Sequence, residues 1–120
     1  MANEIRVTTE MNVRKNGFLI NPGTRNKAIT MAGDDGIQKT QLVGFAAAEL
    51  VDLGEITGAP EYIQLQNQDA TNFVLVGFTN PPTEMKLKPG YTLLIPPTTA
   101  NIYVKADTAA CRITVEAVEA

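Results

Sequence analysis

The residues best suited to hold a ligand lie in one polar stretch near the middle of the chain. Asn67, Asp69, Thr71 and Asn72 bring amide, carboxylate and hydroxyl oxygens together, and calcium accepts about six to eight oxygen ligands of these kinds. The stretch has a single carboxylate, however, and lacks the successive acidic ligands and closing glutamate of an EF-hand loop. Since Asn, Asp and Thr also bond their own backbone, we predict that these residues cap a sharp reversal between two strands, with calcium binding as the alternative.

Two adjacent carboxylates, Asp34 and Asp35, form the next candidate site. Close carboxylates can bind a metal ion or divide acid–base work between them. Neighbouring loop residues point in different directions, and aspartate before glycine is common in turns. The run Gly33-Asp-Asp-Gly36 also lacks the lysine and the following helix of a phosphate-binding loop. We therefore interpret it as a solvated turn.

Cys111 is the single cysteine, and the chain contains no histidine. The absence of histidine excludes Ser-His-Asp triads and histidine-ligated zinc sites, and leaves a cysteine nucleophile without its usual base. One cysteine cannot form an internal disulfide, which is compatible with folding in a reducing cytoplasm. Alternation of Cys111 with Ile113 and Val115 predicts a buried, inert thiol. We therefore expect no catalytic, cofactor-binding or metal-ligating residue and no enzymatic activity.

Aromatic residues offer one further kind of site, a stacking platform for sugars or bases. Without tryptophan, and with an acidic second half of the chain, packing in the core and between sheets is the preferred interpretation. The residues concerned are Tyr62, Tyr91, Tyr103, Phe73 and Phe78.

Charge is unevenly distributed along the chain. Residues 1–40 carry a net charge of +2 and residues 41–120 a net charge of −5. Such asymmetry can favour head-to-tail contact between copies, with solvated surface charge as the alternative. We do not expect a nucleic-acid partner, because binding to nucleic acid usually needs a denser positive patch on the protein. We expect the basic residues to lie in turns or to face away from Ile5, Val7 and Met11; they are Arg6, Arg14, Lys15, Arg25 and Lys27.

The elements that must position these residues are strands. A chain of 120 residues, 44% hydrophobic and 19% charged, is typical of one folded domain. Period-two alternation recurs throughout, whereas no segment repeats apolar residues with helical spacing. No apolar run is long enough to cross a membrane as a helix, and Met1-Ala-Asn-Glu4 lacks the parts of a secretory signal.

Turn signals divide the chain into short strands. Asn16-Gly17 predicts a hairpin turn, and Pro89-Gly90 predicts a type II turn. Residues 46–53 are ambiguous, and we interpret them as a strand with one helical turn as the alternative. The pattern predicts an all-β fold, a single β-sandwich of about 8–10 short antiparallel strands over residues 1–120, with Greek-key or jelly-roll connections. Besides the ambiguous residues 46–53, the expected strands cover residues 5–13, 18–20, 28–31, 37–45, 62–66, 73–78, 85–88, 91–95, 101–105 and 109–117.

Three runs in residues 50–118 resemble a small β-rich structural protein of tailed-phage virions. They are Tyr62-Ile-Gln-Leu-Gln-Asn67-Gln-Asp69-Ala-Thr-Asn72-Phe-Val, Met85-Lys-Leu-Lys-Pro-Gly90 and Ile102-Tyr-Val-Lys-Ala-Asp107-Thr-Ala-Ala. The resemblance implies a virion component, such as a capsid decoration protein, a minor capsid protein or a head–tail part. Its motifs are structural, and they carry no site residues to this chain.

We therefore expect a non-enzymatic bacteriophage structural protein that assembles in the host cytoplasm and works through protein–protein contacts. The expected partners are further copies of the chain and a major capsid or other virion protein. We expect no contact with a membrane. Residues 1–10 are the expected N-terminal arm or edge strand that pairs with a neighbour. The alternative is a carbohydrate-binding or host-surface-binding sandwich.

Overall fold

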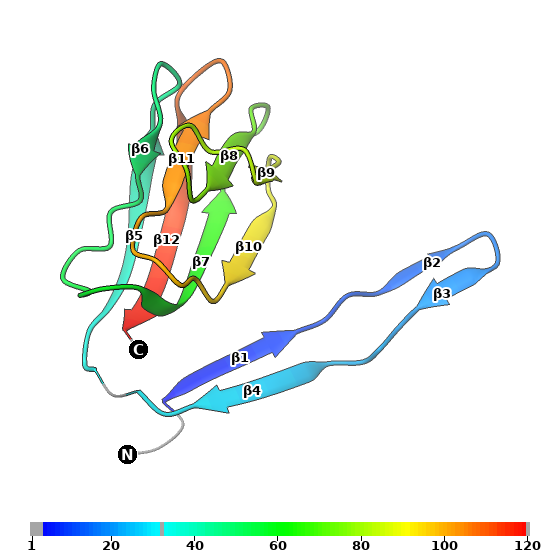
Figure 1. Ribbon diagram of the computed structural model, residues 1–120. Helices are drawn as coiled ribbons and strands as arrows, with labels where there is room; N and C mark the ends of the chain where they lie inside the picture. Colours follow the sequence, from blue (N-terminus) through cyan, green and yellow to red (C-terminus); the bar gives the residue numbers. More distant parts are fainter. Residues whose placement is uncertain (1–3, 32, 120) are drawn as a thin grey trace. The chain divides into compact units, whose positions relative to one another are not determined.

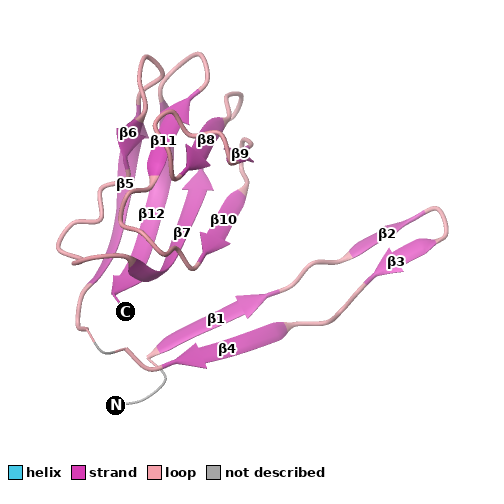
Figure 2. Ribbon diagram, in the orientation of Figure 1, coloured by secondary structure: helices cyan, strands magenta, loops and turns pink. Residues whose placement is uncertain are grey.

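The computed structural model describes residues 4–31 and 33–119, and these residues form β-strands and no helix (Figures 1 and 2). The predicted all-β fold is confirmed. The described residues therefore include no helix that could span a membrane. The chain separates into two compact units that divide between residues 32 and 33. We call residues 4–31 the N-terminal ribbon and residues 33–119 the body.

The N-terminal ribbon is a single antiparallel hairpin with two successive ladders. In the outer pair, β1 (Ile5–Thr9) runs against β4 (Arg25–Ile29), with Ile5 opposite Ile29. In the inner pair, β2 (Val13–Lys15) runs against β3 (Phe18–Ile20). Each ladder is two-stranded, so every ribbon strand has one edge with no strand paired to it.

The body consists of two four-stranded antiparallel sheets. The strand order is β10-β7-β12-β5 in one sheet and β6-β11-β8-β9 in the other. The strands are β5 (Gly36–Val43), β6 (Glu49–Leu50), β7 (Pro60–Asn67), β8 (Val74–Gly77), β9 (Met85–Leu87), β10 (Thr92–Ile95), β11 (Tyr103–Ala106) and β12 (Cys111–Glu119).

The pairing of the body strands is nested. The first strand, β5, pairs with the last, β12; β6 pairs with β11, β7 with β10, and β8 with β9. Pairs β7–β12 and β8–β11 then complete the two sheets. A long hairpin rolled up in this way is a jelly roll, the eight-stranded double sheet that also occurs in viral capsid and lectin domains.

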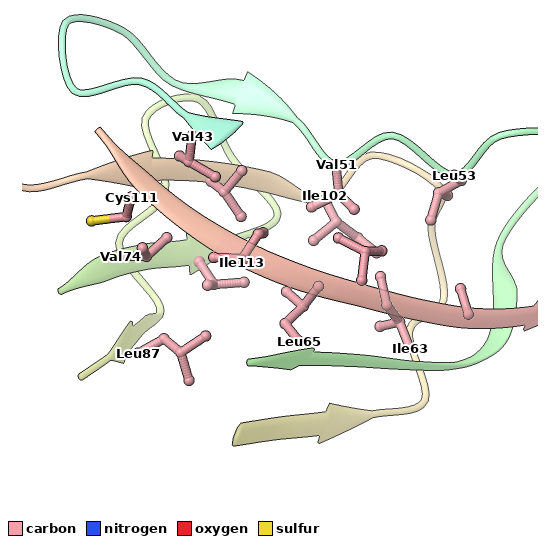
Figure 3. Close-up of a cluster of buried hydrophobic side chains, with 14 of the residues drawn as sticks. Val43, Val51, Leu53, Ile63, Leu65, Val74, Leu87, Ile102, Cys111 and Ile113 are labelled. Carbon is pink, nitrogen blue, oxygen red and sulfur yellow. The ribbon is translucent and has the colours of Figure 1, made fainter. Parts of the chain in front are cut away.

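Alternating apolar residues of both sheets form the core of the body (Figure 3). On β12, Cys111, Ile113 and Val115 point inward and are fully buried, while Arg112 is exposed. This is the alternation that the sequence predicted for the last strand. Other fully buried core side chains are Val43, Ile63, Leu65, Val74, Val76, Ile102 and Val104.

Some predicted boundaries differ from the structure. The sandwich was expected over residues 1–120, but residues 5–29 pair only with each other and the sandwich occupies the body. Residues 46–53 were expected to form a strand, of which only the two residues of β6 pair, with no helical turn. The reason is that Val51 and Leu53 are anchored in the core instead of continuing a ladder.

Candidate interaction site

The ribbon is reversed by the turn that its sequence predicts. Asn16 and Gly17 connect β2 to β3, and both have positive φ, 40° and 90° respectively. Two central residues with positive φ give the turn whose twist matches that of the flanking strands, and Asn-Gly is its preferred sequence. The predicted hairpin turn is confirmed.

Pairing is interrupted between the two ladders, where residues 10–12 face residues 21–24. Pro22 has no N–H to donate to a ladder, and Gly23 has a φ of 83°. Side chains tie the strands together on the β1–β4 side of the break: the Thr24 hydroxyl donates to Glu10 at 2.9 Å, and the Thr8 hydroxyl donates to Asn26 at 3.0 Å. The ribbon is therefore held by its ladders and by exposed polar bonds.

Apolar and basic side chains are interleaved on the ribbon. The register places Val7 opposite Lys27, Arg14 opposite Leu19, and Lys15 opposite Phe18. Since cross-strand partners share a face, Lys27 lies on the same face as Val7. The expectation that the basic residues face away from Val7 or lie in turns is wrong for Lys27 and Arg25. Arg25 lies in β4 opposite Thr9, which shares a face with Val7, so the register of β4 decides the face of both cations.

The ribbon leaves large apolar side chains in solvent. The exposed fractions are 61% for Met11, 53% for Phe18, 65% for Leu19 and 42% for Ile20, and Ile5 is the one described ribbon residue that is buried. Phe18 and Ile20 lie on one face of the β2–β3 ladder and Leu19 on the other. Water therefore meets apolar residues on both faces of the same short ladder.

A hollow of about 340 Å³ lies at the break in the ladders. Met11, Ile20 and Pro22 supply its apolar lining, and Glu10 and Arg25 supply charges of both signs. The lining is thus mixed, with apolar side chains beside one carboxylate and one guanidinium group.

The ribbon cations form no ion pair with any residue that the structure describes. Of the described residues, Lys39 and Asp52 form an ion pair, and both belong to the body. The ribbon has five basic residues against the two acidic residues Glu4 and Glu10, a net charge of +3. The ribbon thus combines exposed apolar groups, cations without an ion-pair partner among the described residues, and open strand edges.

The candidate ligand residues of the body form a turn, as predicted. Asn67 is fully buried; its amide donates to the carbonyls of Asn72 at 2.9 Å and Leu87 at 3.0 Å, and its oxygen accepts from the Asp69 N–H. One Asp69 oxygen accepts from the N–H groups of Thr71 and Asn72. The reversal joins β7 to β8, which lie in different sheets.

These bonds also decide the ionisation of Asp69. The backbone N–H groups of Asn72 and Thr71 stabilise the carboxylate and lower the pKa of Asp69 below its usual 3.8. The Asp69 carboxylate thus accepts its hydrogen bonds from backbone N–H groups of the same turn.

Cys111 is buried, as the alternation predicts. Burial, followed by the negative charges of Asp69 and Asp107, raises the pKa of its thiol above the usual 9.0. The thiol therefore stays protonated at neutral pH, a state in which it is a poor nucleophile.

Asp34 and Asp35 lie in the loop before β5, at the point where β12 ends. The Asp34 N–H donates to a Glu119 carboxylate oxygen at 3.2 Å, and the Asp35 carbonyl accepts from the Glu119 N–H at 2.8 Å. The Asp34 side chain is exposed and that of Asp35 half-buried. The contacts are those of a connecting loop.

The aromatic candidates are dispersed. Tyr62 and Tyr103 are half-buried on the outer faces of different sheets, and Tyr91 and Phe78 are exposed in separate loops. Phe73 is covered by the Lys86 ammonium at 4.3 Å from the ring centre. The fold does not gather these rings into one stacking surface.

Sequence reasoning missed residues 11–29 as part of the candidate interaction site, since the arm was expected over residues 1–10, of which residues 1–3 lie outside the described residues. A signal for it is present in Phe18-Leu19-Ile20. Three consecutive apolar residues in a strand put apolar groups on both faces, which a sandwich strand with one solvated face does not need.

Comparison with protein-family models, with curated proteins and with solved structures gives no match to this chain. The comparisons therefore contribute no functional assignment, and the fold alone does not supply one.

Proposed function

We propose that this chain is a non-enzymatic structural protein of a bacteriophage virion, a capsid decoration protein or a minor capsid or head–tail component. It acts by protein–protein contact, and the N-terminal ribbon is the contacting element. The virion role rests on the sequence resemblance, and the jelly-roll body is compatible with it.

The observation that carries this proposal is the ribbon's lack of a core. A two-stranded hairpin is marginally stable in water and needs a third strand or a packed face. The ribbon has one buried residue and four largely exposed apolar ones, Met11, Phe18, Leu19 and Ile20. Contact with a partner gives these side chains the packed face that the ribbon lacks.

The proposal is tested on purified particles. Particles from the culture that encodes the chain are isolated on a density gradient and analysed by mass spectrometry. Peptides of this chain at a constant ratio to the major capsid protein are the expected result. Their absence from intact particles contradicts the virion role.

The ribbon's part in the contact needs a paired comparison. Phe18→Ser/Leu19→Ser removes two exposed apolar side chains from the ribbon, while Leu42→Ser/Phe45→Ser removes two from the body, where they are 56% and 50% exposed. We expect the ribbon variant to be lost from particles and the body variant to be retained. Equal incorporation of both variants would remove the ribbon from the mechanism.

A further inference from the structure

The two units of the chain carry opposite charge. The ribbon has a net charge of +3, whereas the body has eleven acidic and five basic residues in positions 33–119, a net charge of −6. Charge of one sign on the ribbon and the other on the body is complementary between two copies of the same chain.

The negative charge of the body gathers at one end of the sandwich. β5 and β7 begin, and β12 ends, at this end, where Glu119 is bonded to Asp35 and opposes Pro60. Lys39, in the middle of β5, is paired with Asp52, so that neither charge belongs to this end. We call this surface the acidic end; its acidic residues are Asp34, Asp35, Glu55, Glu61 and Glu119.

We propose that the ribbon of one copy docks on the acidic end of the body of a second copy. This inference rests on the proposed function and names the partner of the ribbon. The cations of the ribbon contact the carboxylates of the acidic end. The apolar residues and free strand edges of the ribbon supply contacts that do not depend on salt. Ribbon-to-ribbon pairing is opposed by the same charge, since each ribbon is positive.

A ribbon-to-body contact uses two different surfaces and is therefore heterologous. Contacts of this kind form a closed ring when the rotation between copies closes, and an open filament when it does not. The chain is thus a head-to-tail assembler, whose interface weakens as salt screens the charges.

Charge reversal on each surface tests the contact in the full-length chain. The ribbon variant is Arg14→Glu/Lys15→Glu, and the body variant is Asp34→Lys/Glu55→Lys; these four side chains are exposed and have no ion-pair partner in the described residues. Sedimentation velocity measures assembly of each variant and of their equimolar mixture.

We expect the wild type to assemble, and each variant alone to need at least about ten-fold higher concentration, because like charges then face each other. The mixture should recover assembly, since the reversed ribbon of one variant matches the reversed body of the other. Recovery in the mixture requires contact between copies, and contact of a ribbon with its own body cannot produce it.

Three results would overturn the inference. If the body variant alone assembles like the wild type, the ribbon pairs with another ribbon. If the mixture stays monomeric, the charges do not form the contact. If the wild type is monomeric at all concentrations, copies do not bind each other, and recovery of the chain in particles then still decides the proposed function separately.

One matched pair of variants tests where on the body the ribbon docks. Glu55→Lys reverses one charge at the acidic end, and Asp107→Lys reverses one in the loop between β11 and β12, at the other end of β12. Both side chains are exposed. Glu55→Lys should weaken assembly, and Asp107→Lys should leave it within about two-fold of the wild type. If both variants weakened assembly equally, general charge attraction and not the acidic end would be the cause of assembly.

Discussion

Replacing Asn67 with alanine should destabilise the body by about 3 kcal/mol. The Asn67 side chain makes three hydrogen bonds, to the carbonyls of Asn72 and Leu87 and from the Asp69 N–H. A hydrogen bond contributes roughly 1 kcal/mol, and a buried polar group left without a partner costs about 1–3 kcal/mol. The bond to Leu87 is buried and the other two are partly buried, so the sum is about 3 kcal/mol rather than the maximum.

Urea titration followed by circular dichroism measures this loss, and tyrosine fluorescence provides a second signal because the chain has no tryptophan. Gln68→Ala is the matched control, since the Gln68 side chain is exposed and the backbone bond of its N–H to Arg112 is retained. The control should lose less than about 0.5 kcal/mol. If Asn67→Ala also lost less than about 0.5 kcal/mol of unfolding free energy, the stabilising role given to the hydrogen bonds of Asn67, including the bond from β7 to Leu87 of β9, would be refuted.

Asn67→Asp adds a test with a definite sign. The aspartate oxygens would face the Asn72 and Leu87 carbonyls, which raises the folded-state pKa of the new carboxyl above its unfolded value of about 3.9. Its stability relative to the wild type should therefore be lowest at neutral pH and should recover as the pH falls and the carboxyl is protonated. A difference from wild type that is constant with pH would contradict the buried, acceptor-facing position.

Three further predictions concern other contacts of the body. The pKa of Asp69 is lowered from 3.8, so its contribution to stability is present above that pH and is lost as the pH falls through the lowered pKa. Asp69→Asn should therefore flatten the acid limb of a profile of unfolding temperature against pH, measured between about pH 2 and pH 6. An unchanged acid limb would contradict this. Cys111 should react with a thiol reagent at least about 100-fold more slowly in the folded chain than in denaturant, and fast reaction of the folded chain would contradict its burial. Gly77→Ala should lower the unfolding temperature, because a Cβ there would clash with the Glu84 carboxylate oxygen that accepts from the Phe78 N–H. An unchanged temperature would show that the carboxylate moves freely.

Local chemistry in the sequence predicted the turns of this fold well. Asn16-Gly17 has the positive φ values of a hairpin turn, and at Pro89-Gly90 the φ of Gly90 is 79° while the Tyr91 N–H donates to the Lys88 carbonyl, as in a type II turn. The same chemistry does not specify which strands pair. Both the 67–72 reversal and the Pro89-Gly90 turn carry the chain from one sheet to the other, and only the packing of the two sheets decides this.

The candidate interaction site was predicted only in part. The basic bias of the first residues and an N-terminal pairing element were visible in the sequence, but the extent of the element depends on β4 pairing with β1 across the intervening residues. The face of Lys27 depends on the same register. Alternation within one strand cannot supply the register of two, which is a property of the turn and the break between them.

The nested pairing of the body has a consequence for biosynthesis. The ribbon's ladders are complete in sequence once residue 29 has left the ribosome, whereas β12, which lies between β5 and β7, consists of residues 111–119. Contacts between the first and last strands of the body give high contact order, which slows folding. Until residues 111–119 have been translated, β5 and β7 therefore have no central strand between them. A nascent chain that pauses near residue 110 exposes both edges beside an already translated ribbon, which makes this stage the one most prone to wrong association between copies.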